Sequence, residues 1–284
     1  MQNRQTPPID YLVIGHITQD LVEGGVMLGG TASYSTLTAF SLGMNTALLT
    51  ACPRWLELPE LANIIIQRKA SQYATTFENI ETETGRHQIV HQCAAMISEE
   101  DVPEAWQNAR IVHLGPIAAE INPNIINAFP NAFLGLTPQG WMRIWGADGR
   151  VHFQPWQNSG DLLERADAVV FSVEDLQGNE ELISEYAQAT RVLAVTEGFN
   201  GARVYWNGDV RHITAPMVKV ANQTGAGDIF AAVFFTRLYQ TKNPWEAGKQ
   251  AVQLASQSVT RIGLAGIPSL EEIRRSLVDV VTGS

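Results

Sequence analysis

The residues with the clearest chemical potential are Gly225-Ala226-Gly227-Asp228. The two glycines predict a tight turn, and the apolar residues that follow at helical spacing predict that the turn leads straight into a buried helix. The first N–H groups of a helix lack internal partners and lie at the positive end of its dipole, so this stretch can bind an anion such as phosphate. Asp228 is then either a favourable acid in the first helical turn or a general base for transfer of a phosphoryl group to an alcohol.

Other polar residues follow apolar stretches that predict buried strands. Asp20 lies shortly after the apolar run 11–14, and Gln139 and Arg143 lie shortly after the run 133–136. Because ligands of open parallel sheets bind at the carboxyl ends of the strands, these side chains are candidate ligand contacts. Asp20 also suits the role of a helix cap or turn residue, and both alternatives stay open.

Two acidic residues, Glu174 and Asp175, end the predicted strand 168–172. Carboxylate oxygens are the ligands that hard cations such as Mg²⁺ prefer. Acidic residues are equally suited to capping the helix predicted to follow, around 180–189. The sequence therefore offers a candidate metal site with a competing structural interpretation.

The elements that must position these residues alternate between strands and helices, which predicts an α/β fold with a central, mainly parallel sheet flanked by helices. The stretch 75–96 departs from this alternation and indicates polar strands of a hairpin. Together with 20–29 it is expected to form a small β lid. The length of 284 residues fits a single domain over 1–284.

Composition narrows the function classes. The formal net charge of −10 and the pI of about 5.1 argue against a nucleic-acid surface and against binding to an anionic membrane. Only Cys52 and Cys93 are present, without metal-ligand spacing, so we expect neither a disulfide framework nor a zinc site and favour a reducing cytoplasm. No apolar run is long enough for a membrane span.

The stretch around Asp228 resembles the second signature of the ribokinase/PfkB family of carbohydrate and nucleoside kinases. Residues 224–228 match it, whereas Asn222 and Gln223 replace the usual Asp and Thr. Since the family's Asp often helps to organise a monovalent-cation loop, we do not expect potassium activation. The first signature is similar as well: Gly29 and Gly30 open a small-residue helix that ends in Leu-Gly at 42–43.

Tyr34 stands where many family members carry Asn, so the acceptor need not be ribose. The Gly-Gly-Thr-Ala-Ser-Tyr version looks more like the branch that contains myo-inositol kinase. Thr196, Gly198 and Gly201 match a further family segment, Thr-x-Gly-x-x-Gly, that lies near the nucleotide phosphates.

The resemblance implies a ribokinase-like three-layer fold, ATP and Mg²⁺, and a role for each matching residue. Asp228 would be the general base, and Gly225, Ala226 and Gly227 the anion hole. Asp175 or Glu174 would support the metal through water. The expected acceptor contacts are Asp20, Gly29, Gly30, Tyr34, Gln139 and Arg143, and the expected nucleotide contacts are Thr196, Gly198, Gly201, Thr224, Ala255 and Ser258.

The sequence contains neither a P-loop motif nor a Gly-x-Gly-x-x-Gly fingerprint after its first predicted strand, which disfavours the two commonest alternative nucleotide-binding classes. The leading hypothesis is an ATP-dependent kinase for a hydroxyl of a small sugar or polyol, either a monomer or a homodimer. The alternatives are a nucleoside kinase of the same fold and a non-catalytic sensor that binds nucleotide or polyol.

Overall fold

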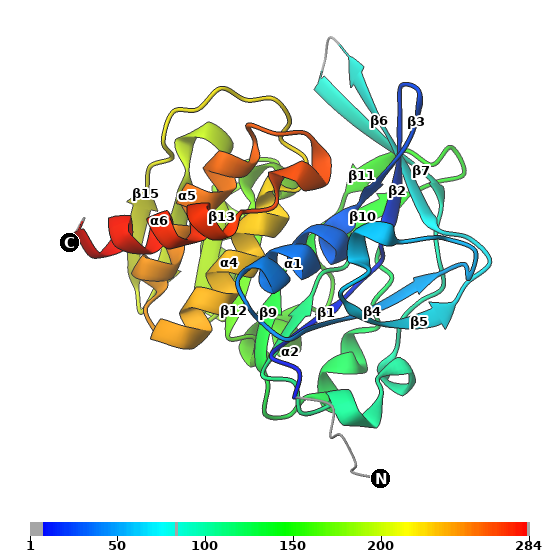
Figure 1. Cartoon of the computed structure of the whole chain (residues 1–284), viewed down its shortest axis with the longest axis horizontal. Helices are drawn as coiled ribbons and strands as arrows, with labels where there is room; N and C mark the ends of the chain where they lie inside the picture. The colour runs from blue at the N-terminus through cyan, green and yellow to red at the C-terminus, as the bar shows by residue number, and fades with distance from the viewer. Residues whose placement is uncertain (1–7, 83–84, 283–284) are drawn as a thin grey trace.

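A large twisted sheet forms the centre of the molecule (Figure 1). The computed structural model describes residues 8–82 and 85–282, so the remaining parts of 1–284 lie outside the description. Within these residues the strand order is β15-β14-β13-β12-β9-β8-β1-β4-β5. Their bounds are β1 Tyr11–Ile14, β4 Thr46–Cys52, β5 Ile65–Ala70, β8 Ile111–Leu114, β9 Phe133–Leu136, β12 Ala168–Ser172, β13 Val192–Thr196, β14 Ala202–Trp206 and β15 Asp209–Ile213.

The strands from β13 to β5 pair in parallel, and β14 and β15 add an antiparallel edge. Central strands such as β1 and β4 are buried along their whole length, which is why they appear in the sequence as continuous apolar runs. The expected mainly parallel α/β sheet is confirmed.

Helices cover both faces of the sheet and create two apolar cores. Tyr11 and Val13 face one core, where they join residues of the helices α1, α4 and α5. Leu12 and Ile14 face the other core together with residues of α2 and α3. This alternation produces the expected three layers. The helices span α1 Gly30–Ser41, α2 Gly160–Arg165, α3 Glu180–Ala189, α4 Ala226–Thr241, α5 Pro244–Ser258 and α6 Leu270–Thr282.

A second, smaller sheet stands at one end of the molecule, at the upper right of Figure 1. Its order is β3-β2-β6-β7, with a parallel β2–β6 pair between two antiparallel pairs. The strands span β2 Thr18–Val22, β3 Gly25–Gly29, β6 Thr75–Thr82 and β7 Gly85–Gln92. A two-stranded ribbon, β10 Arg143–Trp145 with β11 Val151–Phe153, is separate from both sheets.

Two buried polar residues fix the junction between the sheets. The ring of His16 contacts the Thr75 hydroxyl through Nδ1 at 2.7 Å and the Ala95 carbonyl through Nε2 at 2.9 Å. The Glu120 carboxylate accepts hydrogen bonds from the backbone N–H groups of His16, Ile117 and Ala118. These bonds satisfy groups that would otherwise be costly to bury, and they hold the ends of β1 and β8 against the start of the small sheet.

None of the described helices is both long and apolar enough to cross a membrane.

Candidate active site

The N-terminus of α4 forms an open cradle of backbone N–H groups. Gly225 is its N-cap residue with φ of 82°, in the left-handed region that favours glycine, and no side chain caps the helix. A Cβ at Gly225 would lie 2.3 Å from the ring of Tyr34, so the backbone also approaches this ring too closely for any side chain. A Cβ at Gly227 would meet no atom within 4 Å. The uncapped N–H groups and the open side at Gly227 suit a phosphate group.

Asp228 lies in the first turn of α4 and is held by α1. The Thr31 hydroxyl donates to its Oδ1 at 2.7 Å, and the Ser35 hydroxyl donates to its backbone oxygen at 3.2 Å. Thr31 and Ser35 are small, buried residues of α1, and their size lets the two helices pack closely. The side-chain hydrogen bond fixes the orientation of the carboxylate beside the cradle.

The surroundings of Asp228 raise the pKa of its carboxyl group above the usual range of an aspartate. Burial raises the pKa of its carboxyl group to about 6, and the Thr31 hydrogen bond opposes this rise. The charges of Asp175 and Asp20 raise the pKa further, whereas Arg143 lowers it. A carboxylate whose pKa lies near the working pH is suited to general-base catalysis.

Asp20, Arg143 and Asp175 come from different parts of the chain, and the charge of each one acts on the Asp228 carboxyl group. Asp20 accepts a hydrogen bond from the Thr18 hydroxyl at 2.9 Å. A Cβ added at Gly29 would lie only 2.4 Å from Asp20 Oδ2. The structure therefore brings the expected acceptor contacts Asp20 and Gly29 together. Gly30, with φ of 83°, starts α1, and a Cβ there would lie 2.8 Å from the His16 carbonyl oxygen.

Arg143 begins β10 beneath the small sheet. Its Nη1 donates to the Ile117 carbonyl at 3.0 Å, and its guanidinium lies 5.8 Å from the centre of the Phe77 ring. Its positive charge also lowers the pKa of the Asp228 carboxyl group.

Tyr34 is almost completely buried, with 1% of its surface exposed. Among the described residues its hydroxyl has no hydrogen-bond partner. Burial raises the pKa of this hydroxyl far above its usual range, and the charges of Asp228 and Asp20 raise it further. A buried hydroxyl without a partner beside two carboxylates is a candidate for a bond to a ligand.

Of the two candidate metal residues, Asp175 already has protein partners. Gln139 Nε2 donates to Asp175 Oδ1 at 2.6 Å, and the backbone N–H of Ser172 donates to Asp175 Oδ2 at 2.9 Å. The second bond belongs to a capping box of the short 3₁₀ helix Val173–Leu176, whereas α3, the helix that the sequence offered for capping by these acids, is capped by Asn179. Glu174 is exposed. In the described part of the chain no three His, Cys, Asp or Glu side chains gather as a metal cluster. The residues fit an ion held mainly by phosphates and water, which is how proteins usually bind Mg²⁺.

The expected nucleotide contacts lie at the end of β13 and just after it, directly before α4, or on α5. Thr196 donates its hydroxyl to the Phe171 carbonyl at 3.3 Å, and the Thr224 N–H is bound by the Asn222 side chain at 3.0 Å. Ser258 is buried and donates its hydroxyl to the Ala255 carbonyl at 2.7 Å. Gly198 has φ of 57° with open space around it, whereas a Cβ on Gly201 would lie 1.9 Å from the Ile213 carbonyl oxygen. Gly201 is therefore required for the approach of these two backbones.

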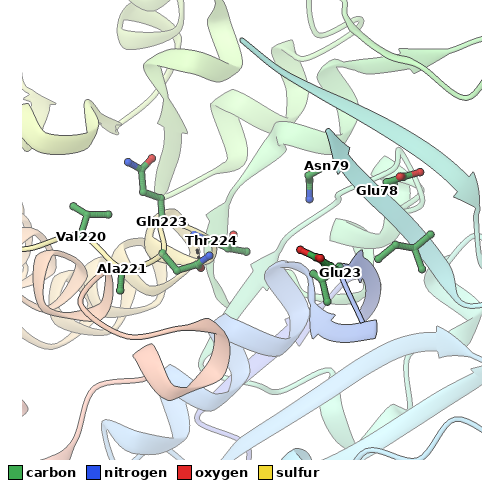
Figure 2. Close-up of a pocket in the computed structure, with 10 residues that line it drawn as sticks. Glu23, Glu78, Asn79, Val220, Ala221, Gln223 and Thr224 are labelled. Carbon is green, nitrogen blue, oxygen red and sulfur yellow. Dashed lines mark hydrogen bonds between the residues drawn. The ribbon is translucent and has the colours of Figure 1, made fainter. Parts of the chain in front are cut away.

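A cavity of about 880 Å³ lies between the small sheet and the segment that precedes α4. Figure 2 shows Glu23 and Asn79 of the small-sheet side across a gap from Gln223 and Thr224. Thr224 directly precedes the Gly225 cradle. The cavity therefore extends from the small sheet to the residues just before the N-terminus of α4, and its volume suits a small-molecule ligand.

Comparison with known proteins connects this geometry to a family. Residues 163–271 match the pfkB family carbohydrate kinase. The chain is 30% identical to a fructokinase of Escherichia coli over 164 residues, which cover 50% of this chain and 50% of the fructokinase. The match thus spans about half the length of that relative. A cytidine kinase of Thermococcus kodakarensis is 23% identical over 260 residues, covering 80% of this chain and 87% of the kinase.

Solved structures share the whole fold. A pyrophosphate-dependent kinase in the ribokinase family, complexed with a pyrophosphate analog and myo-inositol, superposes with a TM-score of 0.77 at 20% identity. This likeness covers 93% of the present chain and 99% of that structure. Over residues 163–271 the chain is therefore similar to the PfkB family. The fold is accordingly the ribokinase-like fold that the sequence signatures implied.

Sequence reasoning missed Thr31, which orients Asp228. Its position directly after the Gly29-Gly30 pair was the available signal, because a residue there lies in the first turn of α1. Sequence reasoning also missed Asn79, which lines the cavity from β6. No local motif marks Asn79, since its position on the small sheet depends on strand register.

Proposed function

We propose that this protein is an ATP-dependent kinase that phosphorylates a hydroxyl group of a small sugar or polyol. The observation that carries the proposal is the position of Asp228 in the first turn of α4. There a carboxylate with a pKa of about 6 directly follows an uncapped helix N-terminus and is oriented by Thr31. A proton acceptor beside an anion cradle is the combination that transfer of a phosphoryl group to an alcohol requires.

In this mechanism Asp228 accepts the proton of the acceptor hydroxyl while the oxygen attacks the terminal phosphorus of the donor. The backbone N–H groups of Gly225, Ala226 and Gly227 bind the negative charge on the transferred phosphoryl group. Asp20 and Tyr34 bind the acceptor, and Arg143 contributes positive charge on the same side of the site. The small sheet acts as a lid over 20–29 and 75–96 and excludes water, which prevents hydrolysis of the donor.

The donor extends from the cradle toward β13 and α5. Thr196, Gly198 and Thr224 lie along its phosphates, and Ala255 and Ser258 border the base. When bound, Mg²⁺ neutralises charge on the phosphates, with Asp175 or Glu174 contacting it through water. Gln139 orients Asp175 through their 2.6 Å hydrogen bond.

The relatives define which acceptors and donors to compare. The names of the fructokinase and the cytidine kinase suggest fructose and cytidine as acceptors to test, and the structural neighbour, which was solved with myo-inositol, suggests myo-inositol. That neighbour is pyrophosphate-dependent, so pyrophosphate is tested beside ATP. Turnover of cytidine alone would replace the proposal by a nucleoside kinase, and tight binding of ATP without turnover of any acceptor would favour a sensor.

The central test is the Asp228→Asn variant, which keeps the size of the side chain and removes its basicity. We expect a loss of turnover of at least about 100-fold, within the contribution typical of general-base catalysis, with donor affinity retained. Asp148→Asn, at an exposed carboxylate, is the matched control and should keep the wild-type rate. A near-normal rate for Asp228→Asn with intact donor binding would refute the assignment of the base.

A further inference from the structure

A cluster of polar and charged side chains surrounds Arg203 of β14, near the antiparallel edge of the large sheet. The guanidinium group binds two carboxylates: Nε donates to Glu197 Oε1 at 2.6 Å, and Nη1 and Nη2 each donate to one oxygen of Glu180 at 2.8 Å. Nη1 also donates to the Tyr205 hydroxyl at 3.0 Å. His212 Nε2 lies 3.4 Å from the second oxygen of Glu197. None of these side chains takes part in the proposed phosphoryl transfer.

The cluster joins two connections at the carboxyl ends of neighbouring strands. Glu197 directly follows β13 and lies between two of the expected nucleotide contacts. Glu180 is the first residue of α3, which follows the segment after β12. Because β12 and β13 pair in parallel, both connections leave the same end of the sheet. Asp175, whose charge acts on Asp228, lies in the segment between β12 and α3. Arg203 therefore ties together two parts of the candidate active site.

Strand register shows to which side of the sheet Arg203 draws the Glu197 carboxylate. Arg203 pairs with Val195 on β13 and with His212 on β15. Val195 belongs to the apolar core that α2 and α3 cover, and directly paired residues share a face, so Arg203 lies on the α3 side. The helices α4 and α5 cover the opposite face. Glu197 is therefore held on the face opposite to the helix whose N-terminus forms the anion cradle.

The charge of Glu197 makes this position important. Its side chain is only 16% exposed, so water screens the carboxylate weakly, and Arg203 neutralises it at short range. A phosphoryl donor carries negative charge on its phosphates, which a neighbouring carboxylate without a partner would repel. The pair with Glu180, which is 63% exposed, contributes little to stability by itself. Its effect is to fix the direction in which the guanidinium points.

We propose that Arg203 is a positioning residue for the phosphoryl donor. It holds the Glu197 carboxylate on the α3 side of the sheet, so the loop 196–201 presents Thr196 and Gly198 to the donor phosphates rather than a negative charge. Each of its three guanidinium nitrogens donates to a protein acceptor, so Arg203 acts through Glu197 and not by contact with the donor. This proposal rests on the proposed kinase function.

The test uses Arg203→Met, Glu197→Gln and the double variant. Calorimetry measures the binding of ATP and of pyrophosphate, and steady-state assays measure the KM of donor and acceptor. Arg191→Met is the matched control, because Arg191 lies at the opposite end of β13 and forms a partly exposed pair with Asp167 at 3.0 Å.

For Arg203→Met we expect the donor KM to rise about tenfold, as for one uncompensated charge near a phosphate, with weaker donor binding and an unchanged acceptor KM. Glu197→Gln alone should change the donor KM little. Added to Arg203→Met, it removes the uncompensated carboxylate and should bring donor binding back close to the wild-type value. The control should keep both KM values.

The outcomes separate this proposal from the proposed function. If the wild type phosphorylates none of fructose, myo-inositol and cytidine with either donor, the kinase function fails and this proposal fails with it. If the wild type is active while Arg203→Met keeps its donor binding and donor KM, only this proposal is overturned. Weaker donor binding that Glu197→Gln does not restore would overturn it as well. Equal changes in donor KM, acceptor KM and thermal stability would show a structural role of Arg203 and would also overturn it.

Discussion

Replacing Thr31 by Val tests how the position of Asp228 controls its basicity. Thr31 Oγ1 donates to Asp228 Oδ1 at 2.7 Å. The Thr31 methyl group, Cγ2, lies against Gly115, and a Cβ added at Gly115 would be 2.4 Å from this methyl group. Valine keeps this methyl group and nearly the same volume, and it exchanges the hydroxyl for a second methyl group. The substitution therefore removes one hydrogen bond to the carboxylate with little change in packing.

The expected shift follows from the strength of that bond. A hydrogen bond to a charged group contributes roughly 1.5–3 kcal/mol, and one pKa unit corresponds to about 1.4 kcal/mol. Because this bond stabilises the ionised form, its loss should raise the Asp228 pKa from about 6 by roughly one to two units. A general base works when deprotonated, so the acid limb of kcat against pH should move to higher pH by the same amount.

The assay is the pH dependence of kcat and of kcat/KM between pH 5 and 9 with a saturating donor, beside urea unfolding of each variant. Thr31→Ser is the matched control, because it keeps the hydroxyl and removes the methyl group near Gly115. It should lower the free energy of unfolding by about 1 kcal/mol and leave the acid limb in place. An unmoved acid limb in a stably folded Thr31→Val protein would refute the role of this hydrogen bond.

Three further predictions concern Gly225, Tyr34 and His113. Gly225→Ala should abolish turnover, because the new Cβ would lie 2.3 Å from the Tyr34 ring and because φ of 82° disfavours alanine. Normal donor binding and normal turnover in a steady-state assay would contradict this prediction. Tyr34→Phe removes a buried hydroxyl that has no hydrogen-bond partner among the described residues. The free energy of unfolding in urea should therefore stay unchanged or rise by about 1 kcal/mol, while the acceptor KM rises. A lower free energy of unfolding would contradict this prediction, because it would mean that the hydroxyl makes a hydrogen bond within the protein. Burial lowers the pKa of His113 from 6.5 to about 3. Below pH 6.5 the unfolded chain takes up a proton on this ring, whereas the folded protein does not do so until about pH 3. The free energy of unfolding should therefore fall by roughly 2 kcal/mol between pH 6.5 and pH 5. The difference in urea unfolding between wild type and His113→Gln isolates this effect, and equal pH slopes would disprove it.

Much of the architecture could be predicted because its signals are local. Apolar runs such as 11–14 predicted strands that are buried on both faces, and the structure places them inside the parallel sheet. The Gly225-Ala226-Gly227 turn predicted a helix start, and α4 begins at Ala226. Turn geometry and side-chain periodicity depend on neighbouring residues, so the sequence carries them directly.

The partners of the site residues could not be predicted, because they depend on packing between distant elements. Thr31 and Asp228 are 197 positions apart, and the contact of α1 with α4 brings them together. The hydrogen bond between Gln139 and Asp175 joins residues that the sequence had assigned to the acceptor and to the metal.

The sequence by itself determined the chemical groups of this protein: a glycine cradle, a carboxylate beside it and the strands that carry them. Only the tertiary structure determined how basic the carboxylate is and which face of the small sheet each side chain occupies. Burial and the Thr31 hydrogen bond act on the Asp228 pKa, and strand register puts Asn79 and Glu78 on opposite faces of the small sheet. The physical reason is that desolvation and side-chain direction across a sheet arise only when segments far apart in the chain pack together.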